Sequence, residues 1–194
     1  MNERGPASAD AAIWLARHGE TDDNREPLRI QGHRDVGLND TGRDQAERLA
    51  RRVAGCNVQI ASLHASHLSR ALHTARIVGD EVGLQPQVDQ RLAESDRGDW
   101  EGRRWEDVAA EDPHGYAAWR AAGPGFRFPG GESLAEHSER VERALSDIRD
   151  GGRLPALVVC HGGTIRVALC RAAGLGLGAF HDFEVPNGSL LALT

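Results

Sequence analysis

The residues whose side chains are best suited to take part in a reaction form one short run, Ala16-Arg17-His18-Gly19-Glu20-Thr21. Arg17 carries a permanent positive charge on a planar guanidinium whose donors suit phosphate. The imidazole of His18 can act as a nucleophile or carry a proton near neutral pH. Gly19 lets the backbone turn and approach a ligand closely. The run therefore predicts chemistry on an anion, provided that further polar groups converge on it.

The elements around this run favour such convergence. A buried strand is predicted from Ala11 to Ala16, and a second short apolar run, Leu157 to Cys160, is followed at once by His161-Gly162-Gly163. A helix is expected to open at Thr164. Since open α/β sheets bind ligands outside the carboxyl ends of their strands, the two histidines are expected to meet in one crevice.

Strands and helices alternate along the rest of the chain. Further strands are predicted at Val58–Leu63, Gln85–Val88 and Ser189–Leu193. Apolar residues at helical spacing predict helices from the N-cap Thr41 to Gly55, from Leu68 to Gly83, and from a Ser133/Glu136 capping box to Gly151. This order predicts an α/β fold with a mostly parallel central sheet, helices on both faces, and hence three layers.

Two segments do not follow this alternation. Residues 1–10 are small and polar and are predicted to form a disordered arm, with residues 11–194 forming one domain. Residues 95–131 hold most of the aromatic side chains and lack periodicity, so we expect an excursion with short helices near 104–111 and 113–121. Its aromatic and arginine side chains fit either a lid over a substrate or a subsidiary apolar cluster with solvated charges.

Composition excludes several classes of function. The chain has 194 residues, 27% of them charged, and a net charge of -6 without a Lys/Arg block, which argues against a nucleic-acid binder. No run is apolar enough for a membrane helix or a signal peptide, so a cytoplasmic protein is expected. The three cysteines form no CxxC pair and are interpreted as reduced thiols. No metal-ligand spacing is present, so no metal or other cofactor is predicted.

Several different short motifs follow one another along the chain. The chain resembles the histidine phosphatase superfamily, which has the phosphoglycerate-mutase-like fold. The motifs that carry the resemblance are Arg17-His18-Gly19-Glu20-Thr21 with Asn24, Gln31-Gly32 before Leu38-Asn39-Asp40-Thr41-Gly42, Ser66-His67-Leu68-Ser69-Arg70-Ala71, Leu92-Ala93-Glu94, Gly98-Asp99-Trp100-Glu101-Gly102, Pro129-Gly130-Gly131-Glu132-Ser133, His161-Gly162-Gly163-Thr164-Ile165-Arg166 and Pro186-Asn187-Gly188-Ser189.

The resemblance implies a role for each matching residue. His18 would attack phosphorus and become a phosphohistidine, and Glu94 would protonate the leaving oxygen. A carboxyl in that role needs a raised pKa, which burial or phosphate charge could supply. The other implied residues would bind the phosphoryl group or border the entrance; they are Arg17, Arg70, His161, Thr21, Asn24, Gln31, Gly32 and Gly162.

Simpler interpretations stand beside these roles. Arg70 could be a surface helix arginine, and Asn24 a turn former. Glu94 could be a solvated carboxylate, with three acidic neighbours as rivals for the acid role; these are Asp96, Asp99 and Glu101. Asp96-Arg97 also departs from the acidic-aromatic pair that often precedes this glycine in the family, which bears on substrate choice.

The chain lacks the long middle insertion of the glycolytic mutases. It is thereby similar to the phosphatase branch, which includes α-ribazole phosphatase and broad-specificity sugar phosphatases. The first hypothesis is therefore a phosphomonoesterase acting on a small soluble phosphate ester. A phosphoglycerate mutase and a non-catalytic scaffold are the alternatives, and both a monomer and a homodimer stay open.

Overall fold

A computed structural model of the chain describes residues 12–123 and 125–193, so the predicted arm at 1–10 lies outside the described residues. Within them, five strands form one sheet in the order β3-β2-β4-β1-β5. The strands are β1 (Ile13–Arg17), β2 (Ser62–Ala65), β3 (Gln87–Val88), β4 (Ala156–Cys160) and β5 (Leu190–Leu193). All neighbours pair in parallel except β5, which is antiparallel to β1. The mostly parallel sheet is confirmed.

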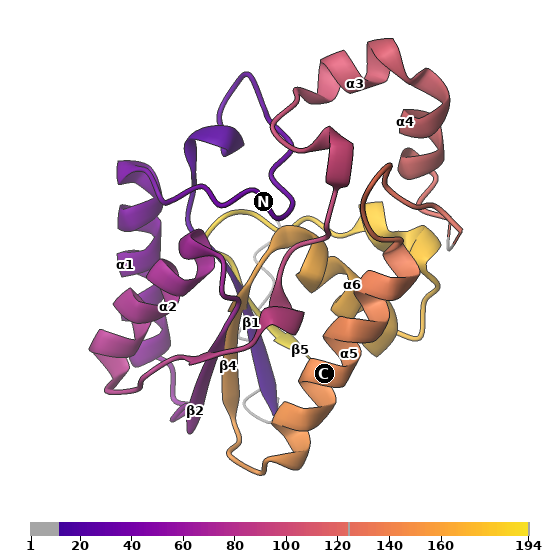
Figure 1. Cartoon of the computed structure of the whole chain (residues 1–194). Helices are drawn as coiled ribbons and strands as arrows, with labels where there is room; N and C mark the ends of the chain where they lie inside the picture. Colours follow the sequence, from indigo (N-terminus) through magenta and orange to yellow (C-terminus); the bar gives the residue numbers. More distant parts are fainter. Residues whose placement is uncertain (1–11, 124, 194) are drawn as a thin grey trace.

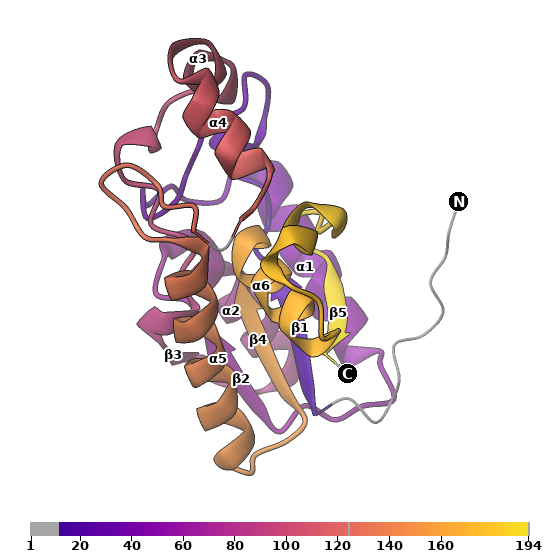
Figure 2. The ribbon, with the colours of Figure 1, turned by 90° about the vertical axis from the view of Figure 1, so that its right-hand side faces the viewer.

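Helices cover both faces of this sheet, as Figures 1 and 2 show. The longer helices are α1 (Asp40–Ala54), α2 (Ser69–Val82), α5 (Leu134–Asp150) and α6 (Gly162–Ala172). Alternate residues of β4 point to opposite faces: Leu157 packs in the cluster with α1 and α2, and Val158 in the cluster with α5 and α6. Both side chains are fully buried, which explains why this strand reads as a continuous apolar run.

The excursion lies above the carboxyl edge of the sheet (Figure 1). It contains α3 (Trp105–Glu111) and α4 (Pro113–Arg120), both within one residue of the predicted bounds. Aromatic side chains of this segment pack with Ile30 into a third, separate apolar cluster. The subsidiary cluster is therefore present, and some of its members also line the cavity described below.

Short 3-10 helices complete the chain at Asp22–Asn24, Gln90–Leu92, Gly98–Trp100 and Leu177–Asp182. The Ser133/Glu136 capping box of α5 is confirmed by two reciprocal bonds of 3.1 and 2.9 Å. The three cysteines are free; Cys160 and Cys170 are buried, whereas Cys56 is partly exposed. Across the two described ranges, no helix is both long and apolar enough to cross a membrane.

Several predicted boundaries were wrong at the helix starts. The N-cap of α1 is Asn39 instead of Thr41, because its side chain accepts a 2.8 Å bond from the Gly42 amide. Helix α6 begins at Gly162, two residues before Thr164, with His161 as N-cap.

The predicted strand at Val58–Leu63 was also displaced. The strand is Ser62–Ala65, since only these residues pair with β4. Val58 and Ile60 instead pack against the apolar cluster outside the ladder. Their apolar pattern indicates burial, and burial is compatible both with a strand paired in the sheet and with an unpaired segment packed against the core.

Shortening the buried Leu157 to alanine is expected to lower the free energy of unfolding by about 2–5 kcal/mol, because the central strand cannot close the resulting cavity. Leu175→Ala is the matched control, since Leu175 is 51% exposed; it is expected to cost less than about 0.5 kcal/mol. Urea unfolding at neutral pH measures both. Equal losses in the two variants would contradict the placement of β4 at the centre of the core.

Candidate active site

His18 lies directly after β1, at the carboxyl edge of the sheet. Its backbone N–H donates to the Cys160 carbonyl at 3.0 Å, extending the pairing of β1 with β4. Its Nδ1 lies 2.6 Å from the carbonyl oxygen of Gly19. Because a carbonyl only accepts, Nδ1 carries the proton and Nε2 keeps a free lone pair. Burial, together with Arg70 and Arg17, lowers the pKa of His18 well below its ordinary value, so the ring is neutral at pH 7.

His161 follows β4 and meets His18, as the strand-end argument predicts. The two ring centroids are 5.2 Å apart. His161 Nε2 lies 2.8 Å from the Ser66 hydroxyl, and its buried Nδ1 has no hydrogen-bond partner among the described residues. Burial lowers the pKa of this ring as well, with Arg70 contributing. The His161 side chain is fully buried and does not line the cavity, so it reaches the cavity only indirectly, through its ring contact with His18.

Two arginines, the half-buried Arg17 and the buried Arg70, hold their charge without an acidic partner at hydrogen-bond distance. Arg17 Nη1 donates to the Val185 carbonyl at 2.6 Å. Arg70 donates through Nη1 to the Arg34 carbonyl at 2.9 Å and through Nη2 to the Gly32 carbonyl at 2.8 Å. The Nε atoms of both arginines are buried and have no partner within the described part of the chain. Arg70 is 1% exposed, so it is not a surface helix arginine.

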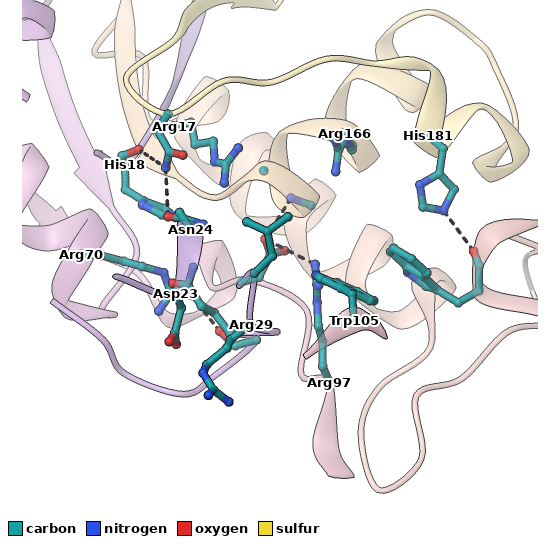
Figure 3. Close-up of a pocket in the computed structure, with 18 of the residues that line it drawn as sticks. Arg17, His18, Asp23, Asn24, Arg29, Arg70, Arg97, Trp105, Arg166 and His181 are labelled. Atoms are coloured by element: carbon teal, nitrogen blue, oxygen red, sulfur yellow. Dashed lines mark hydrogen bonds and ion pairs between the residues drawn. The ribbon is translucent and has the colours of Figure 1, made fainter. Parts of the chain in front are cut away.

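Burial lowers the pKa of both guanidinium groups to about 10, so both remain charged at neutral pH. Arg17 and Arg70 both line the cavity drawn in Figure 3. Buried charges fixed by backbone carbonyls retain their attraction for an anionic ligand, because no carboxylate neutralises them at short range.

Asn24 is both a turn residue and part of the cavity wall. It ends the 3-10 helix Asp22–Asn24, and its Oδ1 accepts from the Thr21 amide at 3.2 Å and from Asn187 Nδ2 at 3.3 Å. Among the described residues, Asn24 Nδ2 makes no bond. Thr21 is fully buried and does not line the cavity, so the predicted phosphate contact of Thr21 does not fit this geometry. Thr21 instead holds Asn24 in place.

Gln31 and Gly32 both line the cavity, at the place predicted for its border. Gly32 has φ +54°, and an added Cβ would lie 2.1 Å from Glu101 Oε1, so glycine is required. Gly32 also orients Arg70 through its carbonyl. Gly19 behaves differently from its prediction: an added Cβ there would meet the Gly42 carbonyl oxygen at 2.1 Å. Its small size serves backbone packing.

Glu94 is buried in the same cavity, held by backbone amides. Its Oε1 accepts from the Ser95 amide at 2.9 Å and its Oε2 from the Gly163 amide at 3.0 Å. Burial alone would raise its pKa, but the charge of Arg97 and these two amides outweigh burial and lower it overall. The raised pKa expected for Glu94 was therefore wrong, because the cavity is so strongly cationic.

The cavity measures about 420 Å³ and is cationic in a chain of net charge -6. Only Asp23 and Glu94 among its lining residues are acidic. The lining arginines are Arg17, Arg29, Arg70, Arg97, Arg120 and Arg166. The N-terminus of α6, with Gly162 at its first position, adds the positive end of a helix dipole. Such a cavity is suited to a phosphate or another oxyanion.

A second layer of polar groups fixes the loop that carries Glu94. Arg140, on α5, donates to the carbonyls of Arg91 and Ala93, each at 2.8 Å, and of Glu94 at 2.7 Å. It also pairs with Glu132. One guanidinium therefore ties the Glu94 backbone to helix α5.

His137, also on α5, lies under the same loop. It is fully buried between the hydroxyls of Ser95, at 3.2 Å, and Thr164, at 3.3 Å. Burial, followed by Arg140, lowers the pKa of His137 to about 3, so the ring is neutral in the folded chain.

Sequence reasoning missed some members of the site. Gly163 holds Glu94 through its amide, and Asn187 bonds both Asn24 and the His18 carbonyl. Both residues lie inside recognised motifs, so position in the motif was the available signal. Arg140 lies in none of those motifs, and only the packing of α5 reveals it. Within the described residues, no group of three or more His, Cys, Asp or Glu side chains is placed to hold a metal ion.

The fold and this cationic histidine site define a class of phosphate-handling enzymes. The model of the histidine phosphatase superfamily (branch 1) matches residues 13–194, and the chain belongs to this superfamily.

Relatives within the superfamily include named phosphatases. The chain is 40% identical to phosphoglycerate mutase-like protein 4 of Arabidopsis thaliana, over 84% of this chain and 71% of that protein. It is 33% identical to the adenosylcobalamin/alpha-ribazole phosphatase of Escherichia coli K12, over 93% of this chain and 88% of that protein. A mycobacterial glucosyl-3-phosphoglycerate phosphatase, solved with VO3, superposes with a TM-score of 0.83 at 29% identity, over 93% of this chain and 89% of that one.

The contact between Gly163 and Glu94 gives a first test of the site. In Gly163→Ala the new Cβ would lie 2.1 Å from Glu94 Oε1, so the carboxyl must move. We expect phosphate release from an alkyl phosphate to fall about 100-fold, the usual contribution of a positioned acid. In Gly162→Ala the nearest atom is 3.5 Å away, in the Arg17 guanidinium, and a loss below about tenfold is expected. Equal losses would show that the Glu94 position is not critical.

The buried histidines give a second test, through pH. The folded-state pKa of His137 is about 3 against an ordinary 6.5, so unfolding takes up a proton between these values. The stability that neutral His137 contributes is complete above pH 6.5 and is lost as pH falls toward 3, at up to about 1.4 kcal/mol per pH unit. When the free energy of unfolding is measured with urea across this pH range, it should fall less steeply with decreasing pH in His137→Gln than in the wild type. His73→Gln, at an exposed position, should keep the wild-type pH dependence. An unchanged slope in His137→Gln would refute the shift.

Proposed function

We propose that the chain is a phosphomonoesterase that hydrolyses a small phosphate ester through a phosphohistidine on His18, with Glu94 as the proton donor. One observation carries the proposal. The His18 ring is fixed through Nδ1 by the Gly19 carbonyl and is neutral, and it lines a cationic cavity that also contains a buried carboxyl. A neutral imidazole with a free Nε2 in such a cavity is an activated nucleophile.

In the first step, the lone pair of His18 Nε2 attacks phosphorus. The N–P bond forms as the bond between phosphorus and the ester oxygen breaks. Protonated Glu94 gives its proton to that oxygen, and the alcohol leaves. The phosphoryl group stays on His18.

Charge that develops on the phosphoryl oxygens meets donors already in place. Arg17 and Arg70 supply cationic N–H groups, and their buried Nε atoms have no other partner in the described chain. Asn24 Nδ2 and the backbone amide of Gly162 supply neutral donors. Preorganised donors of this kind are the main source of catalysis in phosphoryl transfer. His161 acts through its contact with the His18 ring.

Glu94 acquires its proton with the substrate. The surrounding cations by themselves hold the pKa of Glu94 below its ordinary value. A phosphate dianion offsets the charge of Arg17 and Arg70, which shifts the balance toward the protonated carboxyl that burial favours. After the alcohol leaves, the Glu94 carboxylate accepts a proton from water as the water oxygen attacks phosphorus. The N–P bond breaks and inorganic phosphate is released.

The relatives support this class of substrate. The relatives include an adenosylcobalamin/alpha-ribazole phosphatase and a glucosyl-3-phosphoglycerate phosphatase, and the latter has been solved with VO3. For this chain we propose a small phosphate ester without a required metal or cofactor, used in the cytoplasm by a monomer or homodimer. We also propose that residues 95–131 form a lid over the substrate, because Trp105 and Trp119 line the cavity.

Exchanging the nucleophile tests this function. His18→Ala is expected to lose at least about 10³-fold in phosphate release and to lose acid-labile labelling by a radioactive substrate. His73→Ala, on the exposed face of α2, should retain both. Full turnover in His18→Ala would contradict the assignment.

The product then distinguishes the alternatives. With 3-phosphoglycerate, inorganic phosphate supports the phosphatase, and 2-phosphoglycerate would indicate a mutase. A folded chain that releases no phosphate from any ester would indicate a scaffold.

A further inference from the structure

Arg97 stands where the resemblance leads one to expect an aromatic side chain, and the structure places it in the cavity wall (Figure 3). It is 9% exposed. Its guanidinium carbon lies 5.2 Å from the Trp105 ring centroid and 5.6 Å from that of Phe128. Its backbone amide donates to Glu101 Oε1 at 3.1 Å, which fixes the main chain. The guanidinium therefore contacts two aromatic rings at the wall of the cavity.

The charge of Arg97 is only loosely matched. Its Nη2 lies 3.8 Å from Glu94 Oε2, beyond hydrogen-bond distance. Its Nε is buried and has no hydrogen-bond partner among the described residues. The Glu94 oxygens are already bonded to the amides of Ser95 and Gly163. A buried guanidinium with unused donors in a ligand cavity is equipped to bind a second anion.

Arg97 also opposes the proposed acid. Among the charged groups around Glu94 it contributes most to keeping the carboxyl ionised. The other cations that face Glu94 are Arg17 on β1, Arg70 on α2, Arg140 on α5 and Arg166 on α6. The titratable rings of His18, after β1, and His137, on α5, face it as well and are neutral. The transferring phosphoryl group can offset Arg17 and Arg70. Arg97 requires a different anion.

We propose that Arg97 is a specificity-determining residue: it binds a carboxylate or other oxyanion on the alcohol portion of the substrate, and this pairing frees Glu94 to carry its proton. The inference rests on the proposed function and deepens it. Since the Arg97 fork lies next to Glu94, the second anion must be within a few bonds of the ester oxygen. Substrates with a neutral alcohol leave Arg97 paired with Glu94 and are hydrolysed more slowly, above all at alkaline pH.

A matched pair of substrates tests this. In 3-phosphoglycerate a carboxylate replaces the terminal hydroxymethyl group of glycerol 3-phosphate, and the phosphate ester is otherwise alike. For the wild-type chain we expect kcat/KM for inorganic phosphate release to favour 3-phosphoglycerate by about tenfold or more, as for one charge-assisted bond. The alkaline limb of kcat should also lie at higher pH for 3-phosphoglycerate. This measurement needs no variant, so it does not depend on how a substitution affects folding.

Variants assign the effect to the residue. In Arg97→Gln the preference should fall to within about twofold of unity, and the alkaline limb for glycerol 3-phosphate should move to higher pH, because Glu94 loses its nearest cation. A purely structural role would lower both substrates equally and leave the limb unmoved. Arg103→Gln is the control: Arg103 lies in the same excursion, pairs with Glu111 and does not line the cavity. It should keep the wild-type preference and pH profile.

The outcomes separate the two proposals. If His18 is phosphorylated and both esters are hydrolysed equally well by the wild type, the Arg97 inference is overturned and the phosphatase stands. Retention of the wild-type preference in Arg97→Gln overturns it too. If neither ester nor any other labels His18, the proposed function fails, and the inference fails with it.

Discussion

The parallel pairing of β1 with β4 is the contact on which the site depends. It sets Arg17 opposite Cys160, and His18 then donates its backbone N–H to the Cys160 carbonyl. This register brings His18 and His161 into ring contact at the carboxyl edge of the sheet. A shift of one residue would turn the side chains of β1 to the opposite face and separate the two rings.

Concentrated positive charge is the second constraint, and the fold tolerates it through backbone oxygens. Arg17 and Arg70 donate hydrogen bonds to backbone carbonyls. Arg140 likewise donates to three carbonyls of the loop that carries Glu94. Glu94 in turn is held by two amides. Because carbonyls orient the guanidinium groups without cancelling their charge, the cavity retains its attraction for an oxyanion. The same charge explains why the pKa of Glu94 lies below its ordinary value.

The excursion contributes both a small apolar core and part of the cavity wall. Its aromatic residues form a separate small core with Ile30, so it has packing of its own. Trp105, Trp119 and Arg97 nevertheless line the cavity. The wall of the cavity is therefore built from two parts of the fold, the carboxyl edge of the sheet and a segment with a small core of its own.

The sequence by itself determined the α/β class and the alternation of elements, and it pointed to His18, Arg17, Arg70 and Glu94, which line one cavity, because strand ends and ordered motifs are local in the chain. Tertiary structure decided what depends on distant partners. Gly19 is small because Gly42 packs against it, Thr21 supports Asn24 instead of lining the cavity, and the strand near residue 60 is placed by its pairing with β4. The ionisation of Glu94 was likewise decided by arginines that only folding brings together, since Coulomb interactions act through space and not along the chain.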